Sequence, residues 1–86
     1  MTYNGRVKVL AGSEHFIGTM TVTDTLDPEW IGEVISAPPA AAGFGDGPVV
    51  VELLEGPFEG HVSDATIVRR GDTLACSGSN AFFARR

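Results

Sequence analysis

Residues 48–70 read Pro48-Val-Val-Val-Glu-Leu-Leu-Glu-Gly-Pro-Phe-Glu-Gly-His-Val-Ser-Asp-Ala-Thr-Ile-Val-Arg-Arg70. Two runs rich in Val, Leu, Ile and Phe flank the Glu-Gly-Pro turn at residues 55–57, which is the pattern of a long β-hairpin. Five of the six residues at positions 49–54 are apolar, so the first strand is apolar on nearly both faces. Such a strand is either covered on both sides or contributes to an interface between molecules.

The return strand of this hairpin changes the face on which its apolar residues lie. Phe58 and Val62 share one face of an extended chain, whereas Ala65 and Ile67 fall on the other. A β-bulge near residues 63–64 would produce this change, and it would also bend the strand as a small closed barrel requires. We therefore predict a bulge in the second half of the hairpin.

Three more strands are predicted before the hairpin, at residues 3–11, 15–24 and 30–36. Between residues 16 and 23 the even positions are apolar or glycine and the odd positions are β-branched, which suits a half-exposed strand. In the third strand, Trp30 and Val34 are expected to face inward, because Glu33 should face water.

A tight turn at residues 70–72 and a sixth strand of small residues complete the pattern. Six short strands with turns about every 8–12 residues are typical of an all-β domain, here a small antiparallel β-barrel or roll. No internal repeat or second set of elements is visible, so residues 1–86 are predicted to form a single domain.

Residues 37–48 differ from the rest in composition, since ten of the twelve are Ala, Pro or Gly. This composition favours neither a stable helix nor a central strand. A loop of this length in so small a domain is uncommon and often functional. Two interpretations stay open: a crossover whose Phe44 caps one end of the core, or a lid or docking loop.

The charge of the chain limits its partners. Six Lys and Arg face eleven Asp and Glu, and the net charge of −5 argues against general nucleic-acid binding, which needs phosphate neutralisation. No apolar run approaches the roughly 20 residues of a membrane helix, no secretory signal opens the chain, and Cys76 is the single cysteine. We expect an acidic cytoplasmic protein with no membrane partner and no cofactor. The basic residues lie near both ends of the chain, so they would form one basic edge if the first and last strands were neighbours.

His61 and Asp64 are the best candidates for acid–base chemistry, because an imidazole exchanges protons near neutral pH and a carboxylate can orient it. Three positions apart on a strand, they point to opposite faces unless the predicted bulge realigns them. Cys76 lies among small residues on a predicted strand, where a buried and inert thiol is expected. No metal site is predicted, because the acids and histidines lack the spacing of calcium or transition-metal ligands.

Four short motifs carry a resemblance to a known family. In chain order they are Trp30-Ile-Gly-Glu-Val, Gly47-Pro-Val-Val-Val, Glu59-Gly-His-Val-Ser-Asp and the Gly78 turn before Phe82-Phe83. With these motifs the chain resembles the small actinobacterial β-domain of unknown function that occurs alone or appended to flavin-dependent monooxygenases. Ile31, Glu33 and His61 depart from its pattern, which tends to have one aromatic and two basic residues there. The resemblance implies an accessory β-domain of a bacterial protein and transfers no catalytic residue.

Three functions remain open on the sequence. The first is a non-catalytic binding or accessory module that self-associates as a homodimer or docks on a partner protein, because residues 49–54 carry more apolar surface than a small core needs. The second is a pocket for a small hydrophobic ligand in the barrel mouth, under the 37–48 loop. The third, ranked last, is a small enzyme that uses His61 and Asp64. The residues expected on the ligand or partner surface are Met20, Trp30, Phe44, Phe58, His61, Asp64 and Phe82.

Overall fold

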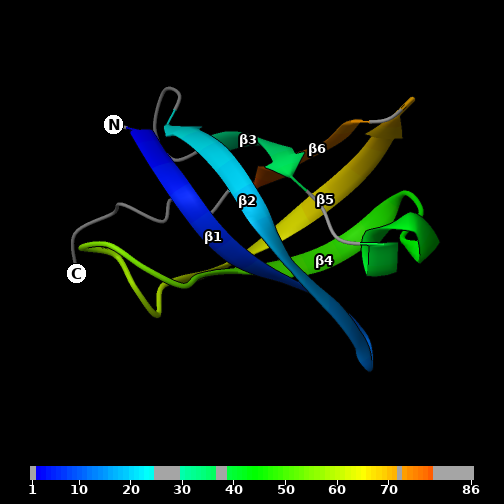
Figure 1. Ribbon diagram of the computed structural model, residues 1–86, viewed down its shortest axis with the longest axis horizontal. Coiled ribbons are helices and arrows are strands. Elements are labelled where there is room, and N and C mark those ends of the chain that lie inside the picture. The colour runs from blue at the N-terminus through cyan, green and yellow to red at the C-terminus, as the bar shows by residue number, and fades with distance from the viewer. Residues whose placement is uncertain (1, 25–29, 37–38, 72, 79–86) are drawn as a thin grey trace.

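The computed structural model describes residues 2–24, 30–36, 39–71 and 73–78. In this part of the chain, six strands form a closed antiparallel barrel in the order β1-β2-β3-β6-β5-β4, so the predicted fold class is confirmed (Figure 1). The elements are β1 (Thr2–Ala11), β2 (Glu14–Asp24), β3 (Trp30–Ser36), the short 3-10 helix η1 (Pro39–Gly43), β4 (Gly47–Leu53), β5 (Val62–Arg70) and β6 (Thr73–Gly78).

The core follows from the alternation of side chains along each strand, because successive residues of a strand point to opposite faces. In β2 the even-numbered residues Phe16, Met20 and Val22 are buried, as the sequence predicts. In β3 the residues Trp30, Gly32 and Val34 are buried, and the alternate residues Ile31, Glu33 and Ile35 face outward, again as predicted. A shift of one residue in either strand would place this apolar set in water, so the pattern fixes the register.

The prediction of a β-bulge near residues 63–64 is wrong. The pairing of β4 with β5 runs without a shift from Gly47↔Ile67 to Glu52↔Val62. Strand β5 begins at Val62, so Phe58 lies in a turn and the return strand has no change of face. The glycines of this turn have positive φ, 82° at Gly56 and 89° at Gly60, which an extended strand does not allow. A register shift occurs instead between Thr19 and Met20, where β2 pairs with β3.

The first and last strands are not neighbours, so the condition for one basic edge is not met. Strand β1 lies between β2 and β4, and β6 lies between β3 and β5. Arg6 and Lys8 are therefore on a different strand from Arg69 and Arg70, which end β5.

The antiparallel order gives the barrel two distinct ends. The starts of β1, β3 and β5 and the loop at residues 54–61 lie at one end, here called the Trp30 end, on the left in Figure 1. The turn after β1, the segment with η1 and the turn after β5 lie at the other, here called the η1 end, on the right.

The η1 end is closed by residues 39–46, called the η1 segment, which precede β4 and lie over the core. Phe44 is buried and meets Phe16 of β2 edge to face, with ring centroids 4.9 Å apart. The Arg69 side chain donates hydrogen bonds to the carbonyls of Ala41, at 2.8 Å, and Phe44, at 3.1 Å. The Arg69 backbone N–H donates to the Asp46 carboxylate at 2.8 Å. Phe44 thus caps this end of the core, and the segment is shorter than predicted because β4 begins at Gly47.

The Trp30 end is closed by a side chain that belongs to the barrel wall. The Trp30 indole is fully buried and its N–H donates to the Ser63 hydroxyl on β5 at 3.0 Å. Gly78 is needed beside it, because a Cβ there would collide with the indole and lie 2.6 Å from the Asp64 carbonyl oxygen. A Cβ on Gly32 would lie 2.8 Å from the Met20 sulfur and 3.3 Å from the indole. The ring therefore requires a glycine at position 78 and is also close to Gly32.

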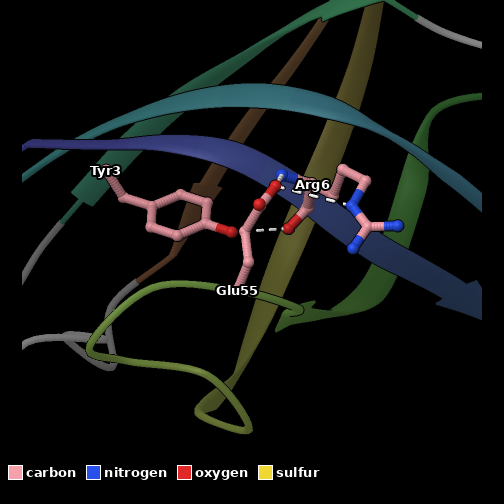
Figure 2. Close-up of polar contacts among 3 residues, drawn as sticks. All are labelled: Tyr3, Arg6 and Glu55. Atoms are coloured by element: carbon pink, nitrogen blue, oxygen red, sulfur yellow. Dashed lines mark hydrogen bonds and ion pairs between the residues drawn. The ribbon is translucent and has the colours of Figure 1, made fainter.

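The loop at residues 54–61 is fastened to β1 at the same end (Figure 2). The Tyr3 hydroxyl donates to the Arg6 carbonyl at 2.6 Å, and the Leu54 N–H donates to the same carbonyl at 3.1 Å. The Glu55 carboxylate accepts from the Arg6 N–H at 2.6 Å and lies 3.5 Å from the Arg6 guanidinium. The exposed ion pair adds little by itself, and the hydrogen bonds set the position of the loop.

Candidate interaction surface

The outer wall of the barrel is divided into two halves that differ in charge. Strands β2, β3 and β6 are adjacent in the barrel, and among the side chains that the structure describes their exposed charged groups are Glu33 on β3 and Glu14 at the start of β2, which is followed by the imidazole of His15. We call this half the neutral sector. Its outward residues are His15, Ile17, Thr19, Thr21, Thr23, Ile31, Glu33, Ile35, Thr73, Ala75 and Ser77.

The other half consists of β5, β4 and β1 and is called the charged sector. Its outward positions include five charged side chains, and Lys8 pairs with Glu52 across β1 and β4. The charged residues are Arg6, Lys8, Glu52, Asp64 and Arg70. One chain thus presents a half rich in charged side chains and a half with fewer charges and more exposed isoleucine and threonine.

Three isoleucines are the most exposed apolar groups of the neutral sector. Ile31 is 54% exposed and Ile35 is 55% exposed on β3, and Ile17 is 47% exposed on the neighbouring β2. The pairing places Ile31 between Thr23 and Ser77, and Glu33 between Thr21 and Ala75. β-branched residues and small side chains suit such a strand surface, but threonine would serve as well as isoleucine for the fold. Exposed isoleucine on adjacent strands is therefore better suited to contact with another surface.

The predicted ligand surface is not gathered in one place. Met20 and Trp30 are fully buried, Phe44 is buried, and Phe58 is partly buried against the core. Trp30 starts β3 and Phe44 lies in the segment after that strand, so the two are at opposite ends of the barrel. Phe82 lies outside the described residues.

The apolar strand of the hairpin is also less exposed than its sequence indicates. Val49, Val51 and Leu53 are buried in the core, and Val50 on the outer face is 36% exposed. Val50 pairs with Leu10 on one side and with Asp64 on the other, within the charged sector. The exposed apolar surface that the sequence predicts on β4 is therefore small, and the more exposed isoleucines lie on β2 and β3.

The residues proposed for chemistry are separated in the fold. His61 lies in the turn before β5, with its ring 5.5 Å from the Phe58 ring at 72°, and Asp64 lies on the outward face of β5. The bulge that would realign them is absent. Burial raises the pKa of the Cys76 thiol to about 12, so the thiol stays protonated and unreactive at neutral pH. In the described part of the chain, no group of three or more His, Cys, Asp or Glu side chains could hold a metal ion.

A surface cavity lies beside the Trp30 end, where β6 stops at Gly78 while β5 continues back to Val62. It has a volume of about 400 Å³, and a smaller one of about 230 Å³ lies near the turn after β1. Neither is lined by Met20, Phe44 or Phe58. The larger cavity is lined by Trp30, Ile31, Asp64, Ala65, Thr66, Ser77 and Gly78.

No family model, curated protein or solved structure matches this chain. The resemblance to the accessory β-domain of monooxygenases and the cytoplasmic location therefore stay predictions. Among the described residues, no helix has the length and apolar content to cross a membrane.

Proposed function

We propose that this protein is a non-catalytic binding module that docks on a protein surface through its neutral sector. The observation that carries the proposal is the group of three isoleucines, each about half exposed, on the adjacent strands β2 and β3. Fully burying one isoleucine is worth about 1.5–3 kcal/mol, so covering the exposed halves of all three would contribute about 2–4 kcal/mol.

The distribution of charge supports the same role. Charged residues are depleted at the centre of protein interfaces and common at their rims, because a charge that loses water without a partner is costly. The neutral sector has this character, and the charged sector supplies the solubility that an acidic chain needs. A role by contact also agrees with the accessory domain that the resemblance implies.

A photoreactive residue tests where the module makes its contact. Ile31→p-benzoylphenylalanine places the probe in the neutral sector, and Val62→p-benzoylphenylalanine is the matched control, because Val62 is 53% exposed in the charged sector. Irradiation of the purified chain and of living cells should yield a defined cross-linked species from position 31 only. A captured protein, once purified, should bind the wild-type chain and lose affinity for Ile31→Lys. Equal cross-linking from both positions, or none from position 31, would contradict the proposal.

A second candidate function is the binding of a small molecule in the cavity beside Trp30. Its volume of about 400 Å³ lies within the range of about 300–1,000 Å³ that is typical of ligand sites. The cavity combines the apolar Ile31 with the hydroxyls of Thr66 and Ser77 and the carboxylate of Asp64. Trp30 is the single tryptophan and lines this cavity, so tryptophan fluorescence comes from a residue next to the proposed ligand. A metabolite that changes this fluorescence in the wild type but not in Thr66→Val would support this function, and an unresponsive tryptophan would contradict it.

A further inference from the structure

We propose that the partner on the neutral sector is a second copy of this chain, related to the first by a twofold axis that passes near Glu33 of β3. This inference rests on the proposed function and names the partner of the same surface.

The closed barrel determines how two copies can meet. The six described strands close into a barrel in which each strand has a neighbour on both sides, although β1 pairs with β4 only over Val7–Leu10 and β2 with β3 only over Thr19–Asp24. Closure leaves only short stretches of backbone outside the strand pairing, such as residues 14–18 of β2 on the side of β3, for pairing with another chain. The outer wall therefore offers two copies a broader contact, through side chains, than strand pairing does.

The charged side chains indicate which part of the outer wall can form the contact between two copies. A contact through the charged sector would have to remove water from three basic and two acidic side chains, which is costly unless each of them finds a partner. In the neutral sector the charged side chain near the centre is Glu33, and Glu14 lies at the start of β2, at the η1 end. A partner of opposite charge would be expected to meet a charged surface, and the neutral sector has little charge to offer it.

The outward residues of β3 are self-complementary. Along this strand they are Ile31, Glu33 and Ile35, which gives the same pattern in both directions. Outward side chains of one strand are about 6.8 Å apart. When β3 of a second copy lies antiparallel over β3 of the first, each Ile31 meets an Ile35 and the two Glu33 side chains face one another. This is the isologous contact that a twofold axis requires, since residue i contacts residue j and j contacts i.

The area available is sufficient. A stable interface buries about 800 Å² on each partner, which is roughly a sixth of the 5131 Å² surface of this chain. Three of the six strands form the neutral sector, so this area lies within it.

The two facing Glu33 carboxylates are the unfavourable part of the contact, and they provide a specific test. Removing the like charges with Glu33→Gln should tighten the dimer about tenfold or more, since a tenfold change corresponds to about 1.4 kcal/mol. Added salt should tighten the wild-type dimer by screening the same repulsion and should affect Glu33→Gln less. A partner that offered a lysine or arginine to Glu33 would give the opposite sign in both measurements.

Sedimentation velocity of the purified full chain over a wide range of concentration measures the association. We expect a monomer–dimer equilibrium that Ile31→Thr weakens at least tenfold, because threonine keeps the strand preference and removes apolar surface. Val62→Thr, the matched change in the charged sector, should leave the equilibrium unchanged. Circular dichroism of each variant checks that the fold is kept.

The outcomes separate this inference from the function on which it rests. A monomer at every concentration, with cross-linking from position 31 to another protein, would overturn the second copy as partner and leave the docking function standing. A monomer without any cross-link would overturn both. A dimer that Glu33→Gln weakens, or that Val62→Thr weakens as much as Ile31→Thr, would overturn the proposed arrangement.

Discussion

At the Trp30 end of the barrel, an indole ring from the wall itself fills the interior, whereas at the η1 end a separate segment is laid across the opening. The indole packs against Gly78 and donates a hydrogen bond to Ser63 of another strand. The η1 segment is held from outside, by the Arg69 side chain on the carbonyls of Ala41 and Phe44. Closure at the first end is thus part of the barrel, and closure at the second is an addition to it.

The two ends nevertheless share one property that bears on function, because each is occupied by an aromatic ring of the protein itself. Trp30 and Phe44 are both buried, so a ligand that entered between them would have to displace one of them. The wall remains as the broad surface available for contact, and its neutral half is the part suited to a partner. The module is therefore better adapted to binding on its side than in its mouth.

Trp30→Ala tests whether the closures at the two ends contribute differently to the free energy of unfolding. We expect the free energy of unfolding to fall by about 3–5 kcal/mol, because the indole leaves a large cavity that the surrounding strands cannot fill. Phe44→Ala is the matched change at the η1 end, and its loss should be smaller, about 2–4 kcal/mol, since the added segment can settle onto the core. Urea denaturation followed by circular dichroism measures both values, and an equal or larger loss for Phe44→Ala would remove the distinction.

A pair of glycine substitutions sharpens the same comparison. In Gly78→Ala the new methyl group would collide with the Trp30 indole, and we expect a loss of about 1–3 kcal/mol from overpacking. Gly43 of η1 has open space around its Cβ position, so Gly43→Ala should change stability by less than about 1 kcal/mol in either direction. Melting temperatures of the two variants show the contrast, and a stable Gly78→Ala would mean that the indole can move.

Much of the fold was predictable because each strand carries its own signal. The alternation between Phe16 and Thr23 identifies β2, and the inward position of Trp30 follows from the charge on Glu33 three residues later. The hairpin return strand was misplaced because Phe58 is apolar and resembles a strand residue. The two glycines that flank it, at positions 56 and 60, place it in a turn.

The candidate site was less predictable, and for two separate physical reasons. Trp30 and Phe44 were assigned to one pocket, although a strand of seven residues, about 20 Å long, separates the start of β3 from the segment after it. The neutral sector could not be predicted, because it depends on β3 lying beside β6 rather than beside β4. Single strands indicate which side chains face outward, but strand order decides which of them meet.

Arg69→Met tests how much the outside fastening of the η1 segment contributes. Methionine keeps the aliphatic stem and removes the two hydrogen bonds to carbonyls, so we expect a loss of about 1–2 kcal/mol. Arg70→Met changes the same charge on the next residue and should cost less than about 0.5 kcal/mol. Hydrogen exchange of the Phe44 amide should accelerate in Arg69→Met and not in Arg70→Met. Unchanged exchange would show that Phe44 packing alone holds the segment.

Tyr3→Phe tests the hydrogen bond that joins β1 to the loop at the Trp30 end. The Tyr3 hydroxyl donates to the Arg6 carbonyl at 2.6 Å, and losing this bond should cost about 0.5–1.5 kcal/mol at neutral pH. Burial, and to a lesser degree the Glu55 carboxylate, raises the pKa of Tyr3 above its ordinary value of 10.0. The folded state then binds this proton more tightly than the unfolded state does. The stability that Tyr3 contributes is complete below pH 10 and is lost as the pH rises further.

The difference in stability between wild type and Tyr3→Phe should therefore shrink as the pH rises above 10. Cys76 titrates in the same region, because burial raises its pKa from 9.0 to about 12, and it lowers stability above pH 9 by the same mechanism. Both chains should accordingly be compared in a Cys76→Ala background, where the remaining alkaline difference belongs to Tyr3. A difference that stays constant from pH 8 to 11 would show that the hydroxyl is equally free to ionise in the folded and unfolded chains. The loop at residues 54–61 would then be held to β1 by the Arg6 and Glu55 contacts rather than by Tyr3.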